Sequence, residues 1–175
     1  MRKPRLIQEC GPGLESEVWF KQDDQFNQPF VYAKVKICTN DLNFPRTVES
    51  QVFISLWQAL LEEHNRETKA AAEVAGIAFG QTRNMEHLGF QLYCYNENYK
   101  TFFARVFENI RDFTPLPQFF EALRQRMVRV YSNHKLSEPC QIANNYFNEA
   151  CFTDCSSIDS MLEAYENITY EKFLK

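Results

Sequence analysis

The spacing of hydrophobic residues changes partway along this chain, and that change limits the folds available to it. From Phe30 to Thr39 apolar and polar side chains alternate, which is typical of a β-strand with one buried face. From Glu49 the apolar residues recur every three or four positions, which is typical of an amphipathic helix. We expect Asn65–Arg66 to bend this helix into two and Gly76 to end the second one.

The rest of the chain adds strands before and helices after this region. A short strand is predicted at Val18–Lys21, after residues 1–16, where the Pro and Gly residues predict an irregular lead-in. Two more strands are predicted at 77–82 and 88–95. The later helical segments are predicted at 102–113, 116–130, 139–151, 158–165 and 170–175. The pattern predicts an α+β domain over residues 17–175, with helices packed on one face of an antiparallel sheet and a last helix that stops early.

Composition and charge exclude several classes of protein. Of the 175 residues, 45% are hydrophobic and 15% aromatic, which is too apolar for a disordered chain. The formal net charge of −4 leaves no excess of basic side chains for phosphates, so we expect no nucleic-acid partner. No apolar run is long enough to span a bilayer and no secretory signal follows the basic start, so we expect no membrane partner and a cytoplasmic location.

Six cysteines are scattered along the chain, without the crowding of a small disulfide scaffold. We expect them to be reduced thiols with a structural role. Cys151 and Cys155 are spaced to share a helix face, yet no CxxC pair and no nearby histidine completes a zinc site.

Four segments carry a resemblance to a known family. They are Val18–Asp24, Ala71–Gly76, Gly89–Asn96 and Phe119–Tyr146, the last of which includes Ser137-Glu138-Pro139. In order and spacing they resemble the third domain of the insulinase (insulysin or pitrilysin-like) zinc metallopeptidases. The resemblance covers about Glu17 to Lys175.

This resemblance implies a specific place in a larger enzyme. Such enzymes have four related α+β domains, arranged as two halves around a closed chamber, and the first domain holds the zinc and the catalytic glutamate. The resemblance therefore implies a non-catalytic domain that walls the chamber and packs against sister domains of a peptide-hydrolysing parent. Its implied partners are those domains and, through the chamber, peptide substrates.

The family's inverted zinc motif, H-x-x-E-H, has only a partial counterpart here. Glu63 and His64 stand where its last two residues would be, but Leu60 replaces the first histidine. Glu138 is a weak positional match for the downstream glutamate ligand. Catalytic zinc takes three protein ligands, so we expect no metal, no cofactor and no catalytic residue in this chain, with Glu63 and His64 a degenerate remnant. His64 is expected to be a core or interface histidine.

Other candidate groups are interpreted as structural. Met85-Glu86-His87 is expected to be a solvated turn, and His134 to lie at a helix end. A set of arginines, which we call the basic group, is expected to form a solvated helix face; the alternative is that it contacts an acidic partner domain. The basic group comprises Arg105, Arg111, Arg124, Arg126 and Arg129.

Two other functions stay open. One is a stand-alone protein-binding or assembly module that reuses the fold, and the other is an autonomous metalloenzyme that uses Glu63 and His64. An isolated third domain is also expected to expose apolar surface and to self-associate.

Overall fold

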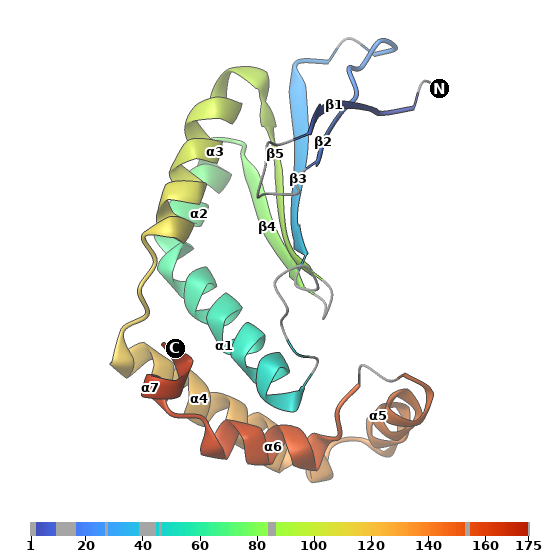
Figure 1. Cartoon of the computed structure of the whole chain (residues 1–175), viewed down its shortest axis with the longest axis vertical. Coiled ribbons are helices and arrows are strands. Elements are labelled where there is room, and N and C mark those ends of the chain that lie inside the picture. Colours follow the sequence, from blue (N-terminus) through green and yellow to red (C-terminus); the bar gives the residue numbers. More distant parts are fainter. Residues whose placement is uncertain are drawn as a thin grey trace. The chain divides into compact units, whose positions relative to one another are not determined.

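The computed structural model describes residues 3–9, 17–26, 28–38, 45, 47–83, 87–152 and 155–174. The chain divides into two compact units, Met1–Phe30 and Val31–Lys175. Helices and small antiparallel sheets make up the fold (Figure 1), so the predicted α+β class is confirmed.

The first unit contains a two-stranded antiparallel sheet. Strand β1 (Arg5–Glu9) pairs with β2 (Glu17–Phe20), with Leu6 opposite Trp19 and an irregularity between Leu6 and Gln8. The prediction that residues 1–16 are irregular is wrong for β1, because pairing with a later strand outweighs the local Pro and Gly signals. Residues 10–16 lie outside the described part of the chain. The domain boundary at residue 17 stays a prediction.

The second unit is built on a three-stranded sheet. Strands β3 (Phe30–Cys38), β4 (Ala78–Arg83) and β5 (His87–Tyr95) follow the spatial order β3-β5-β4. β4 and β5 pair antiparallel from Ala78 opposite Tyr93 to Arg83 opposite Leu88. All three strands agree with the predicted ones to within a residue or two, because their alternation is strong enough to identify them.

Two consecutive helices lie between β3 and β4. Helix α1 (Val48–His64) is preceded by the N-cap residue Thr47, whose side chain accepts a hydrogen bond from Ser50 N. Helix α2 (Arg66–Val74) follows after the single residue Asn65. The predicted bend is thus confirmed.

Gly76 ends α2, as predicted, in a backbone conformation that favours glycine. Its φ of 72° lies in the left-handed region. Gly76 N donates to Glu73 O, and Ile77 N donates to Ala72 O, so two otherwise unpaired helix carbonyls are satisfied. Ala72 and Ile77 are both buried in one core cluster, which ties the end of α2 to the start of β4.

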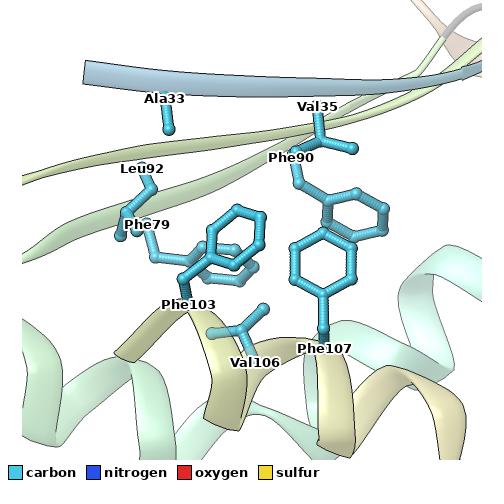
Figure 2. A pocket seen from close by; sticks show the side chains of 8 residues that line it. All are labelled: Ala33, Val35, Phe79, Phe90, Leu92, Phe103, Val106 and Phe107. Atoms are coloured by element: carbon cyan, nitrogen blue, oxygen red, sulfur yellow. The ribbon is translucent and has the colours of Figure 1, made fainter. Parts of the chain in front are cut away.

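Helix α3 (Asn96–Arg111) covers one face of the three-stranded sheet with aromatic side chains. Figure 2 shows Phe103 and Phe107 of α3 directed toward Phe90 and the sheet, around a small apolar cavity of about 10 Å³. The ring centroids of Phe90 and Phe107 are 5.9 Å apart, and those of Phe103 and Phe107 are 4.5 Å apart. On the opposite face Tyr32, Lys34, Lys36, Tyr93 and Tyr95 are exposed.

A second core cluster lies among the helices. It joins α1 to α4 (Pro117–Ser132), α6 (Ile158–Asn167) and α7 (Tyr170–Phe173). Between α4 and α6 the chain forms the 3₁₀ helix η2 (Asn133–Leu136) and helix α5 (Pro139–Cys151). The buried members of this cluster are Val52, Leu56, Leu60, Phe120, Met161, Tyr165 and Phe173.

Replacing Phe120 by alanine tests the helical core. The side chain is 1% exposed and packs against the rings of Tyr170 and Phe173, at centroid distances of 5.5 and 5.1 Å. We expect Phe120→Ala to lower the free energy of unfolding by about 3–5 kcal/mol in urea denaturation. The neighbouring Phe119 is 47% exposed, so Phe119→Ala is the matched control, with an expected change of roughly 0.5 kcal/mol. Equal losses for the two variants would contradict the packing.

Candidate functional site

The C-terminal end of α1 holds the residues that match the zinc motif in part. Leu60 is only 4% exposed and belongs to the helical core cluster. Glu63 is exposed and accepts a hydrogen bond from Arg66 Nη1 at 3.1 Å. The His64 ring is also exposed and lies against Phe113, with centroids 5.2 Å apart. Of the two predicted alternatives for His64, a core position is therefore wrong, because the apolar side of α1 turns away from the helix's last residue, and an interface position stays a prediction.

These side chains do not fit a catalytic zinc ion. Leu60 has no donor atom, and its place in the core cannot be taken by a ligand. Glu138 immediately precedes α5, and its carboxylate accepts a hydrogen bond from Cys140 Sγ at 3.6 Å. Within the described ranges, no three His, Cys, Asp or Glu side chains converge on a possible metal site.

The other two histidines have different surroundings. His134 lies in η2 just after α4, close to the predicted helix end, and its Nε2 is 3.0 Å from Asn145 Nδ2 of α5. His87 begins β5 and is half-buried, so it is part of a strand and does not lie in a solvated turn. Met85 and Glu86 lie outside the described residues.

Arg124 has a structural role within the predicted basic face. It donates to both carboxylate oxygens of Glu121 and to the carbonyls of Tyr165 and Glu166 at the end of α6. The Arg124 hydrogen bond lowers the pKa of Glu121 from 4.5 to about 2. The same pairing raises the pKa of Arg124. This arginine thus joins α4 to α6.

The rest of the basic group offers little to an anion. Arg111 pairs with the adjacent Asp112, with Nε–Oδ1 at 2.7 Å. An open groove of about 360 Å³ is lined by Arg124, Arg129 and Glu166, and the Glu166 carboxylate offsets part of the positive charge. Arg105, Arg126 and Arg129 are exposed, in agreement with a solvated face.

The five described cysteines are free, and most of them lie on the surface. Cys94 is buried, and burial raises the pKa of its thiol. The prediction of structural thiols is wrong for four others, Cys38, Cys140, Cys151 and Cys155, which are free and exposed. The suggestion that Cys151 and Cys155 share a helix face is also wrong, because α5 ends at Cys151. Cys10 lies outside the described residues.

Large apolar side chains are exposed in both units. Trp19 of β2 is 59% exposed, and Leu136 in η2 is 85% exposed. Tyr146 and Phe147 of α5 are 68% and 61% exposed. The aromatic content of the sequence indicates a core, but the sequence alone does not indicate that these side chains lie outside it. Among the described residues, no helix is both long and apolar enough to cross a bilayer.

Comparison with sequence families relates the chain to one domain of a larger enzyme. The family Peptidase_M16_M, described as the middle or third domain of peptidase_M16, matches residues 1–164. The elements from β1 to α5 thus lie within the matched segment, which ends inside α6.

Individual relatives are much longer than this chain. An insulin-degrading enzyme-like 2 from Arabidopsis thaliana is 26% identical over 75% of this chain and 13% of its own length. The A-factor-processing enzyme of Saccharomyces cerevisiae is 24% identical over 91% of this chain and 15% of its own length. The human insulin-degrading enzyme is 25% identical over 95% of this chain and 16% of its own length.

A solved structure shows the same fold. A crystal structure of pitrilysin superimposes with a TM-score of 0.76 at 17% sequence identity, covering 99% of this chain and 18% of that chain. The chain therefore spans less than a fifth of the proteins that it matches.

Zinc analysis tests the interpretation of Glu63 and His64. We expect the purified chain to hold well under one zinc per molecule by elemental analysis, because Leu60 removes one ligand. His64→Ala should leave both the zinc content and the melting temperature in added zinc unchanged. One zinc per chain that disappears in the variant would contradict this expectation.

The Glu121–Arg124 pair predicts a pH-dependent contribution to stability. Because folding lowers the pKa of Glu121 from 4.5 to about 2, this contribution is present above about pH 4.5 and is lost as the pH falls toward 2. Glu121 is 45% exposed, so we expect Glu121→Gln to cost less than about 1 kcal/mol at pH 7 in urea denaturation. The difference from the parent sequence should shrink toward pH 2, whereas the exposed Glu163→Gln on α6 serves as a control without this trend.

Proposed function

Because the chain belongs to the M16 peptidase family and corresponds to its middle domain, we propose that it is a non-catalytic structural domain of an insulinase-type zinc metallopeptidase. In this proposal it walls the chamber in which the parent binds peptides and packs against sister domains. The zinc and the general base lie in another domain, and this chain contributes shape and apolar surface.

The observation that carries the proposal is the family match together with its extent. The match covers residues 1–164, while the chain spans only 13–16% of the length of the relatives described above. A segment of this size within such proteins is one part of a multidomain chain.

Two structural features agree with a supporting role. Leu60 occupies the core where a zinc ligand would be needed, so the end of α1 is suited to packing and not to hydrolysis. Exposed aromatic side chains, such as Trp19 and Phe147, provide surface that an adjoining domain can bury.

Sequencing the complete reading frame and assaying its full product test the proposal. We expect an H-x-x-E-H motif upstream of these residues and hydrolysis of an internally quenched peptide by the full product. A zinc chelator should abolish this activity, and the 175-residue chain alone should show none.

Two outcomes would contradict the proposal. A reading frame that contains only these residues would favour the stand-alone binding module. Peptide hydrolysis by the chain alone, lost in Glu63→Gln, would favour the autonomous enzyme.

A further inference from the structure

Helix α5 differs from the other long helices because none of its residues is buried. It spans Pro139–Cys151, and no side chain of this described segment enters either core cluster. In Figure 1 it lies to one side of α4 and α6. Its largest side chains, Tyr146 and Phe147, are both more than half exposed.

The apolar and polar residues of α5 lie on opposite halves of the helix. At 100° per residue, one half carries only apolar or thiol side chains, which we call the α5 face. The other half is polar apart from Ile142. The α5 face consists of Cys140, Ala143, Tyr146, Phe147, Ala150 and Cys151, and the polar half consists of Gln141, Asn144, Asn145, Asn148 and Glu149.

Only the stripe of α5 that contains Ile142, Asn145 and Asn148 is half-buried, and every other residue of the helix, the α5 face included, is exposed. Asn145 lies 3.0 Å from His134 of η2, between Nδ2 and Nε2, and is half-buried. Ile142 and Asn148, one turn to either side, are half-buried as well, whereas every residue of the α5 face is exposed. A helix on the surface of a single domain normally buries its apolar side.

This orientation calls for a covering surface. A 13-residue helix is marginal in water without tertiary packing of its apolar side. Leu136 and Phe152, at the two flanks of α5, are also exposed and extend the apolar surface.

We propose that the α5 face docks against another domain of the same parent peptidase. This inference rests on the proposed function and specifies which surface makes the contact. The relatives described above hold more than four-fifths of their length outside the matched segment, and α5 lies within that segment. A covering domain is therefore available in the same polypeptide.

A second copy of this chain is a poorer occupant. Helix α5 is about 20 Å long, and two such helices side by side bury less than the roughly 1,200–2,000 Å² of a stable complex. A domain joined through the same chain needs a smaller interface, because the linkage supplies a high effective concentration. The α5 face also has no charged side chain, which suits a contact that stays covered.

Cys140 and Cys151 lie on the α5 face and report directly on its exposure. We expect N-ethylmaleimide to label both thiols at least about tenfold more slowly in the full-length peptidase than in the 175-residue chain, measured by mass spectrometry of their peptides. Gln141→Cys places a thiol on the polar half of the same helix. This control should react at the same rate in both proteins.

A substitution on the α5 face gives an independent readout. Phe147 contributes to neither core cluster, so Phe147→Gln should leave the melting temperature of the 175-residue chain within about 1 °C. In the full-length peptidase the same change should lower the melting temperature by several degrees, because a covered aromatic side chain is replaced by a polar one. Phe120→Ala, in the core, should lower it in both proteins.

Several results would overturn the inference. Equal labelling of Cys140 and Cys151 in a full-length, active peptidase would refute the docking contact and leave the proposed function standing. A stable dimer of the 175-residue chain with these thiols protected would identify a second copy as the occupant. A reading frame limited to these residues would refute the proposed function and the docking contact together.

Discussion

The buried side chain of Asn65 holds the two halves of the second unit together. It ends α1, which packs in the helical core, and precedes α2, which packs beneath the sheet. Its Nδ2 donates to Leu61 O at 3.1 Å, and its Oδ1 accepts from Asn109 Nδ2 of α3 at 3.0 Å. Because an unpaired buried amide costs about 1–3 kcal/mol, these bonds fix the angle between α1 and α2 and the position of α3 relative to both.

The elements that could be predicted from the sequence are those whose signals are local. The alternation after Phe30 and the glycine at position 76 place β3 and the end of α2 correctly, because strand burial and a left-handed backbone each select particular residue types. Strand β1 could not be predicted in this way, because its partner β2 lies beyond a segment rich in Gly and Pro. The sequence shows the apolar side of a helix but not the direction in which that side turns.

The candidate zinc residues illustrate the same distinction. That Leu60 lacks a donor atom is evident from the sequence, so the incomplete ligand set could be predicted. The exposure of His64 could not be predicted, because it depends on α1 ending at His64 and on Phe113 lying alongside. The roles of Arg124 also depend on contacts with α6, far along the chain, which no local pattern encodes.

Aromatic side chains on two helices have opposite environments in this domain. Phe103 and Phe107 of α3 lie against the sheet, whereas Tyr146 and Phe147 of α5 lie in solvent (Figure 2 shows the former). The two helices differ in the stripe that packs, because α5 packs through Ile142, Asn148 and the contact of Asn145 with His134, while α3 packs through aromatic side chains against the sheet. A polar contact that turns aromatic side chains outward brings no gain in hydrophobic burial to this domain by itself. Burial of these outward side chains by another domain, as we propose for the α5 face, would make the arrangement favourable.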